Sequence, residues 1–174
     1  MIVWIVGLSG VGKTTVGSLL VDKIKENDPT WVMIDGDVIR SIFGVDRKTS
    51  DYSVEARRQN AERIISLCTW LDGQKINVIC NILCIFDDLM RNNRELFGEY
   101  FQVELTAPMD VLINRDAKGI YNGYINGLQK NVVGCDIKYD KPTHSDLVID
   151  NSGVNSPVEV VNKIFQKLFF NESL

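Results

Sequence analysis

Continuous apolar runs alternate with segments of helical spacing along the chain. The apolar runs at 2–6, 31–34, 76–83, 100–105 and 147–149 are typical of strands buried on both faces. Apolar residues at helical spacing follow these runs and predict helices over about 13–24, 54–72, 87–96, 109–114 and 157–169. This alternation, with right-handed crossovers, predicts an α/β fold: a single domain over residues 1–174, built on one doubly wound parallel sheet with helices on both faces.

A glycine-rich turn joins the first predicted strand to the first predicted helix. Its residues are Gly7, Leu8, Ser9, Gly10, Val11, Gly12, Lys13 and Thr14, and Thr15 follows. The pattern G-x-x-x-x-G-K-T between a strand and a helix is the phosphate-binding loop, or P-loop. Its glycines let successive backbone N–H groups converge on one anion, and the helix N-terminus adds partial positive charge. We expect these residues to bind ATP, with Lys13 at the β- and γ-phosphates and the Thr14 hydroxyl on Mg²⁺.

Carboxylates follow the second predicted strand, in the sequence Asp35-Gly36-Asp37. Ligands of open α/β sheets bind at the carboxyl ends of the strands, so Asp37 is predicted to face the phosphates as a Mg²⁺ ligand, a base, or both. Asp35 is either a further group of the site or a helix N-cap. Arg40 lies one helical turn after Asp37 and can share its face, as Arg57 and Asn60 can on the next helix.

Two polar segments, residues 44–52 and 116–142, carry turn-forming residues and no strong apolar period. We predict that both are mobile and cover the bound substrates. Ser53, directly after the first segment, is a predicted N-cap of the helix that follows.

Composition narrows the class of protein. A net charge of −4 argues against broad binding to nucleic acid or to a membrane surface. No apolar run reaches the roughly 20 residues that span a bilayer, and the first core strand leaves no room for a signal peptide, so we expect a cytoplasmic protein. The cysteines (Cys68, Cys80, Cys84 and Cys135) lack C-x-x-C spacing and are predicted to be buried or shielded reduced thiols. His144 is predicted at the surface, which leaves general-base work to a carboxylate.

A P-loop alone does not separate a small-molecule kinase from a GTPase or a motor ATPase. The chain has no N-K-x-D-like guanine motif and no D-E pair at a strand end, whereas its length and the early D-G-D favour a small-molecule kinase. A sensor that binds ATP without chemistry is the alternative of another class. The presence of Asp37, Arg40, Arg57 and Asn60 together weighs against it, because a pure binder does not need them.

Three motifs resemble those of the adenylylsulfate (APS) kinase family: Gly7-Leu8-Ser9-Gly10, the D-G-D-V-I-R of 35–40, and the R-D-A-K-G-I-Y of 115–121. The segment that begins at Tyr52-Ser53 also matches the family's F-S-x-x-D-R-x-E-N-I-R-R. The likeness covers nearly the whole chain in the same order. It implies phosphoryl transfer from MgATP to the ribose 3′-hydroxyl of a nucleotide that bears a 5′-linked anhydride.

The resemblance also implies residue roles. Asp37 and Lys13 are the implied catalytic residues, and Asp37 engages the acceptor hydroxyl and, with Thr14, the metal. Arg115 and Lys118 belong to a lid over ATP. The implied acceptor-binding residues are Asp37, Arg40, Tyr52, Arg57, Asn60, Phe86, Lys130 and Val132. The family is often dimeric, so a homodimer is an expectation that rests on the resemblance alone.

The chain departs from the family at Cys84, Asp87 and Val132, where the family has serine, arginine and phenylalanine. In the family that phenylalanine and the aromatic residue at position 52 sandwich the acceptor's adenine, and losing one stacking partner costs about 1–3 kcal/mol. Asp87 is expected to reverse a charge near the acceptor. Some relatives phosphorylate cytidine diphosphoramidate in capsule decoration, and a smaller pyrimidine with an uncharged amide suits these changes. The acceptor is therefore cytidine diphosphoramidate or, as in ordinary family members, adenylylsulfate.

Overall fold

The computed structural model describes residues 1–43, 52–116 and 118–170. Its centre is a five-stranded parallel sheet with the strand order β2-β3-β1-β4-β5. The strands are β1 (Ile2–Val6), β2 (Trp31–Asp35), β3 (Asn77–Ile82), β4 (Tyr100–Thr106) and β5 (Leu147–Asp150). Each predicted strand is present, and its ends differ from the prediction by at most one residue.

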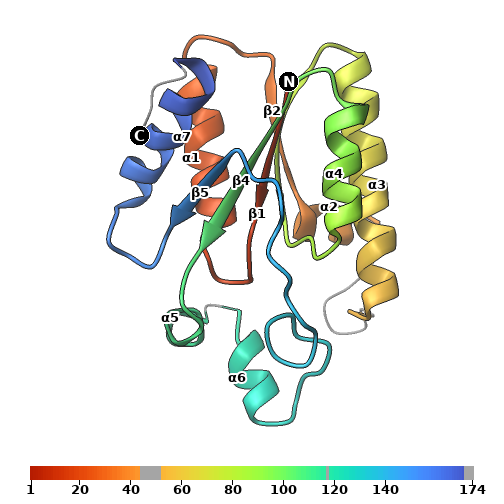
Figure 1. Cartoon of the computed structure of the whole chain (residues 1–174), viewed down its shortest axis with the longest axis vertical. Helices are drawn as coiled ribbons and strands as arrows, with labels where there is room; N and C mark the ends of the chain where they lie inside the picture. The colour runs from red at the N-terminus through yellow and green to blue at the C-terminus, as the bar shows by residue number, and fades with distance from the viewer. Residues whose placement is uncertain (44–51, 117, 171–174) are drawn as a thin grey trace.

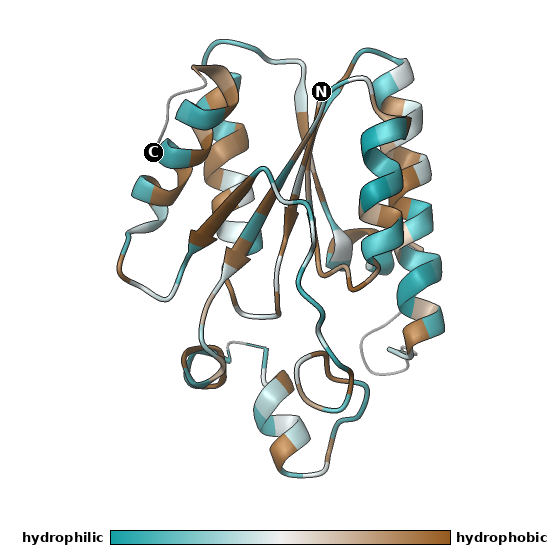
Figure 2. Cartoon of the chain, viewed as in Figure 1, coloured by the Kyte–Doolittle hydropathy of each residue, from teal (hydrophilic) through white to brown (hydrophobic). Residues whose placement is uncertain are grey.

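Helices cover both faces of the sheet, which confirms the predicted fold class (Figure 1). They are α1 (Lys13–Lys25), α2 (Gly36–Ile42), α3 (Val54–Gly73), α4 (Asp87–Leu96), α5 (Met109–Arg115), α6 (Ile120–Ile125) and α7 (Pro157–Phe169). One apolar core lies between the sheet and α1 with α7, and a second lies between the sheet and α3 with α4. Figure 2 shows the apolar strands between helices whose outer faces are hydrophilic.

Local capping explains where the helices that border the site begin. The Ser53 hydroxyl accepts a hydrogen bond from the Ala56 N–H at 3.3 Å, which confirms the predicted cap of α3. Asp35 caps α2 by accepting from the Asp37 N–H at 2.9 Å, so one of its two predicted roles is present. These caps define the first residues of α2 and α3.

The segment after α5 contains the short helix α6, which the sequence pattern did not predict. From α6 the chain passes below the carboxyl ends of the strands and then rises to β5 (Figure 1). Residues 44–51 of the other predicted loop lie outside the described residues. The mobility of both segments stays a prediction.

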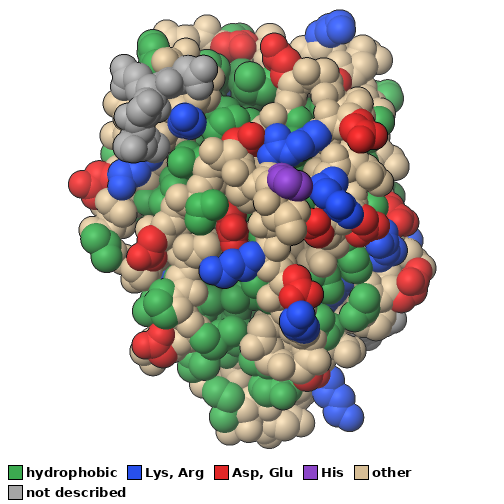
Figure 3. All heavy atoms as spheres, viewed as in Figure 1, with side chains coloured by type: hydrophobic (Ala, Val, Ile, Leu, Met, Phe, Trp, Pro, Cys, Tyr) green, Lys and Arg blue, Asp and Glu red, His purple; other side chains and the backbone are tan. Residues whose placement is uncertain are grey.

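The cysteines and the histidine differ in how far they are buried. Cys68, Cys80 and Cys84 are buried free thiols, as predicted, whereas Cys135 is exposed, so the prediction was wrong at this position. Cys135 is exposed because it lies in the connection beyond the sheet rather than in a strand or helix. His144 is exposed, and Figure 3 shows the histidine at the surface among side chains of both charges. Within the described residues, no helix combines the length and apolar character that crossing a bilayer requires.

Candidate active site

The P-loop connects β1 to α1 and forms an anion cradle. Gly10 and Gly12 have φ values of +75° and +102°, a backbone conformation that residues with a side chain rarely adopt. A Cβ on Gly7 would lie 2.4 Å from the Leu105 carbonyl oxygen, and one on Gly12 would lie 2.6 Å from Nδ2 of Asn151. The glycines are therefore required both by backbone conformation and by close approach, and α1 begins directly behind them at Lys13.

A cavity of about 320 Å³ opens from this loop toward α2, α3 and the segment after α6. It brings together most of the residues singled out from the sequence. Those that line it are Ser9, Gly10, Gly12, Lys13, Thr14, Thr15, Asp37, Arg40, Tyr52, Arg57, Asn60, Lys118, Lys130 and Val132. Gly7, Leu8 and Val11 shape the loop from behind the cavity.

Lys13 is the cation at the centre of the cradle. Its ammonium donates to the carbonyls of Gly7 and Leu8, both at 2.8 Å. Burial, together with the nearby charge of Lys118, lowers the pKa of Lys13 to about 8, although Asp37 and Asp35 act in the opposite direction. The amine thus lies within the P-loop, where successive backbone N–H groups can bind an anion, so a phosphate is the natural partner for it.

The two carboxylates of the D-G-D motif have different partners. Thr14 Oγ1 donates to Oδ2 of Asp35 at 2.6 Å, which places a hydroxyl and a carboxylate side by side at the start of α1. Oδ2 of Asp37 instead forms an ion pair with Lys118 Nζ at 2.5 Å, across the cavity. Hydroxyl and carboxylate oxygens are the ligands that Mg²⁺ prefers, so the Thr14–Asp35 pair fits this ion.

Arginines surround the acceptor end of the cavity. The Arg40 and Arg57 guanidinium carbons lie 4.8 and 5.4 Å from the centroid of the Tyr52 ring. Arg57 also donates to the backbone carbonyls of Tyr52 and Asn131, at 2.9 and 2.8 Å. Burial and the like charge of Arg40 lower the pKa of Arg57. Arg40 is buried, and its Nε has no partner among the described residues, which leaves a donor for an anionic ligand.

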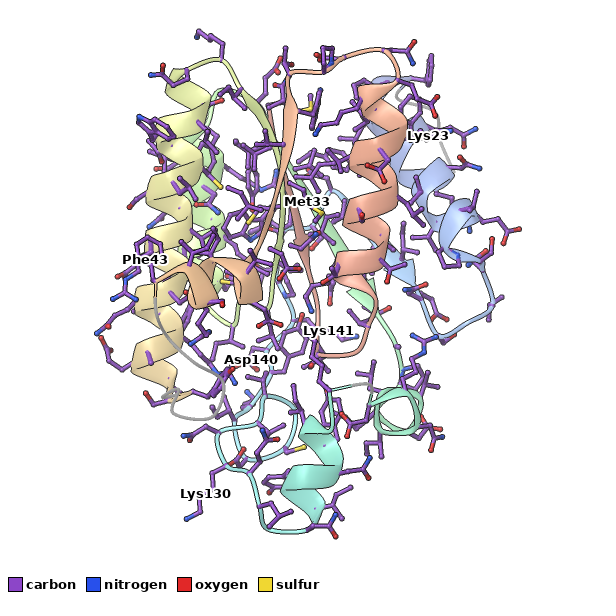
Figure 4. All side chains as sticks on the ribbon, turned by 180° about the vertical axis from the view of Figure 1, so that it is seen from behind. Lys23, Met33, Phe43, Lys130, Asp140 and Lys141 are labelled. Carbon is purple, nitrogen blue, oxygen red and sulfur yellow. The ribbon has the colours of Figure 1, made fainter. Side chains whose placement is uncertain are left out.

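Phe86 and Arg115, two of the predicted site residues, do not line this cavity, and a third, Lys130, has an exposed side chain. The Phe86 ring packs against the Arg58 guanidinium, whose central carbon lies 4.7 Å from the ring centroid. Arg115 donates to the Asn151 carbonyl at 2.8 Å, behind the P-loop. Lys130 lines the rim, and its exposed side chain extends away from the sheet in Figure 4.

Asp87 does not face the acceptor cavity. Its carboxylate accepts from the Thr143 N–H and hydroxyl at 2.9 Å and pairs with Arg91 at 3.3 Å. The Thr143 N–H is the main cause of the lowered pKa of Asp87. The expected charge reversal near the acceptor is therefore wrong, because helix α4 turns this side chain toward the segment before β5.

The structure adds residues that sequence patterns did not assign to the site. Asn151 donates to the Val11 carbonyl at 2.7 Å, and Tyr121 donates to the Ser9 carbonyl at 3.0 Å, so both support the P-loop from behind. Asp136 accepts from the Asn131 and Val132 N–H groups and holds the turn that Arg57 contacts. Asn81 lines the cavity at the end of β3. Tyr121 lies within the R-D-A-K-G-I-Y motif, so the sequence already pointed to this residue.

The fold and the site together define the class. A phosphate cradle at the first strand and a cavity lined by carboxylates and arginines, at the carboxyl end of a parallel sheet, are the features of a P-loop kinase. The chain belongs to the adenylylsulphate kinase family, whose model matches residues 1–150. It is therefore a nucleotide kinase, and its use of ATP with Mg²⁺ follows from this family, as predicted.

Curated relatives and solved structures agree with this assignment. The cytidine diphosphoramidate kinase of Campylobacter jejuni is 36% identical over 167 residues, which cover 96% of this chain and 95% of that protein. The adenylyl-sulfate kinase of Gloeothece citriformis is 31% identical over 95% of this chain and 92% of its own length. The Mycobacterium tuberculosis APS kinase in complex with AMPPNP and APS superposes with a TM-score of 0.85 at 24% identity, over 96% of each chain. The last comparison confirms the fold.

Proposed function

We propose that this kinase transfers the γ-phosphoryl group of MgATP to the ribose 3′-hydroxyl of cytidine diphosphoramidate. The observation that carries the proposal is the one-sided aromatic surface of the acceptor end. Among the described lining residues, Tyr52 is the only aromatic ring, and the lining also contains Val132 and Val133. A pyrimidine has less surface to stack than adenine, so it loses less where a second ring is missing.

The C. jejuni relative supports the same acceptor. It is named a cytidine diphosphoramidate kinase and is 36% identical to this chain, against 31% for the G. citriformis adenylyl-sulfate kinase. Asp87 adds no support, since its carboxylate binds Thr143 outside the cavity. The proposal thus depends on the stacking surface and on this relative.

On the ATP side, each role follows from position. Lys13 binds the β- and γ-phosphates and offsets the charge that develops during transfer, while the P-loop N–H groups orient the same phosphates. Thr14 and Asp35 are proposed to hold Mg²⁺, because their hydroxyl and carboxylate lie side by side, and the bound ion would neutralise phosphate charge. Lys118, which lines the cavity, is proposed to act on ATP from the lid, and Arg115 is proposed to support the site through its hydrogen bond to the Asn151 carbonyl.

On the acceptor side, Asp37 is proposed to receive the hydrogen bond of the attacking hydroxyl. It lies in the cavity with Lys13, and the two interact electrostatically. Arg40, Arg57 and Asn60 are proposed to bind the acceptor's phosphates and ribose, because their polar groups converge on the same end of the cavity. Such positioning of both reactants supplies much of the rate enhancement in phosphoryl transfer.

Adenylylsulfate is the second candidate acceptor, and the match to the adenylylsulphate kinase model favours it. The two acceptors are separated by turnover with MgATP in an ADP-release assay. The panel contains cytidine diphosphoramidate, adenylylsulfate, CDP and buffer without an acceptor. Efficient turnover of the cytidine compound with little on adenylylsulfate supports the proposal, and the opposite preference refutes it.

A substitution at Val132 tests the physical reason for the preference. Val132→Phe introduces a ring at the lining position where the family has phenylalanine. It is expected to raise kcat/KM for adenylylsulfate relative to cytidine diphosphoramidate by about 5- to 150-fold, the equivalent of about 1–3 kcal/mol of stacking. Val133→Phe, at the neighbouring lining position, is the matched control. The KM for ATP and the melting temperature of each variant show whether the larger side chain disturbs the fold. An unchanged acceptor ratio in a folded Val132→Phe variant contradicts the stacking explanation.

A further inference from the structure

Asn81 is a buried polar side chain at the carboxyl end of β3. It is 2% exposed, and neither Nδ2 nor Oδ1 has a hydrogen-bond partner among the described residues. Buried amides in folded proteins are nearly always hydrogen-bonded, because an unpaired one loses its bonds to water without replacement. An asparagine that served packing alone would be paired. The missing partner is therefore expected to come from a bound species.

Gly17 of α1 provides the space for this amide. A Cβ on Gly17 would lie 2.2 Å from Nδ2 and 2.3 Å from Oδ1 of Asn81. Gly17 lies inside a helix and its φ is not positive, so its backbone does not require glycine. Glycine in a helix interior lowers stability relative to alanine. The contact explains this glycine, because any side chain at position 17 would displace the Asn81 amide.

The neighbours of Asn81 indicate which bound species it meets. Asn81 pairs with Asp35 in the register of β2 and β3, and Asp35 accepts the Thr14 hydroxyl hydrogen bond at 2.6 Å. All three residues line the same cavity. In P-loop proteins, Mg²⁺ is held by the P-loop hydroxyl and by an acidic residue of a nearby strand, and it usually keeps several waters.

We infer that Asn81 is a positioning residue of the Mg²⁺ site, and that its carboxamide hydrogen-bonds a water of the metal's coordination shell beside Thr14 and Asp35. Gly17 leaves the room that this amide needs. The inference rests on the use of MgATP and is independent of the acceptor. Partners outside the first coordination shell fix the orientation of metal ligands, and their loss typically lowers metal affinity by about 10- to 100-fold.

The test measures how much Mg²⁺ strengthens binding of a non-hydrolysable nucleotide. The affinity of AMPPNP is determined by calorimetry with Mg²⁺ and with EDTA, and the ratio of the two dissociation constants reports the metal's contribution. Asn81→Ala is expected to reduce this ratio by about 10- to 100-fold while metal-free AMPPNP affinity stays within about twofold. Asn93→Ala is the matched control, since Asn93 is also a buried asparagine but lies in α4 and does not line the cavity.

A second set of variants uses the contact with Gly17. Gly17→Ala is expected to displace the amide and reduce the ratio as Asn81→Ala does, and the double variant is expected to be no worse than Asn81→Ala alone. Asn81→Ser keeps a hydrogen-bonding group, so Mg²⁺ is expected to strengthen AMPPNP binding more in this variant than in Asn81→Ala. It provides a milder test if Asn81→Ala does not fold. An unchanged ratio in Asn81→Ala, or equal weakening with and without Mg²⁺, overturns the inference. Neither readout involves an acceptor, so failure here is distinct from failure of the proposed acceptor.

Discussion

Raising the pH should weaken ATP binding through one residue, Lys13. Burial lowers the pKa of its ammonium to about 8, from the ordinary 10.5, and the nearby charge of Lys118 acts in the same direction. The protonated form binds phosphate, so the competent fraction of the protein falls as the pH rises through about 8. Below that pH Lys13 is charged and the affinity is expected to be constant.

The magnitude follows from the titration of this single group. With a pKa of about 8, Lys13 is about nine-tenths protonated at pH 7 and about one-tenth protonated at pH 9. The apparent dissociation constant is the intrinsic constant divided by the competent fraction, so it is expected to rise about tenfold between these two pH values. The bound triphosphate favours the charged amine, so binding is also expected to take up protons above pH 8.

The assay is titration with AMPPNP in Mg²⁺ across this pH range, on the parent protein and two variants. Lys13→Arg keeps its charge at every pH of the range, so its pH profile is expected to be flat even where its affinity is lower. Lys118→Ala removes a like charge beside Lys13 and is expected to move the fall in affinity to higher pH. A parent profile that stays flat to pH 9, or a Lys13→Arg profile that falls as steeply as the parent's, refutes this explanation.

Two further predictions concern carboxylates. Asp37→Asn is expected to lower kcat by at least about 100-fold, because the Asp37 carboxylate is proposed to accept the hydrogen bond of the attacking hydroxyl. AMPPNP affinity at pH 7 is expected to stay within about threefold of the parent, since Asp37 acts on the ATP side indirectly, through its charge near Lys13 and Lys118. Full activity contradicts this role. Glu104 is 3% exposed, its Oε1 has no partner among the described residues, and burial raises its pKa. A carboxyl whose pKa is raised on folding destabilises the fold as the pH rises above its unfolded pKa, so Glu104→Gln is expected to gain about 1–3 kcal/mol at neutral pH. Thermal unfolding measures this as a rise of about 2–4 °C per kcal/mol, and a gain of the same size in acid, where Glu104 is protonated, contradicts the reasoning.

The sequence allowed the sheet and the phosphate cradle to be predicted, because both depend on short-range patterns. Five apolar runs specify the buried strands, and the glycines between the first strand and α1 have a conformational requirement that local sequence reveals. The cap at Ser53 is equally local. Once strands and helices alternate, the handedness of crossovers determines which end of the sheet holds the ligands.

Side-chain direction in the connections could not be predicted in the same way. Asp87 and Phe86 follow β3 closely, yet neither lines the cavity. The Asp87 carboxylate binds Thr143, and the Phe86 ring packs against the Arg58 guanidinium. The pairing of Gly17 with Asn81 joins residues 64 positions apart, so only the packed structure reveals it. Helix α6 has little apolar periodicity, and Gly119 in the left-handed conformation precedes its first residue.

Packing gives the two carboxylates of the D-G-D motif different partners. Both are acidic, two residues apart and at the end of the same strand, and sequence reasoning favoured Asp37 for the metal. In the structure Asp35 lies against Thr14, whereas Asp37 reaches Lys118 on the other side of the cavity. A carboxylate beside the P-loop hydroxyl is suited to Mg²⁺, and one that faces the lid is suited to the acceptor hydroxyl. The geometry therefore favours Asp35 for the metal and Asp37 for the hydroxyl, with Asn81 on the metal side because it pairs with Asp35.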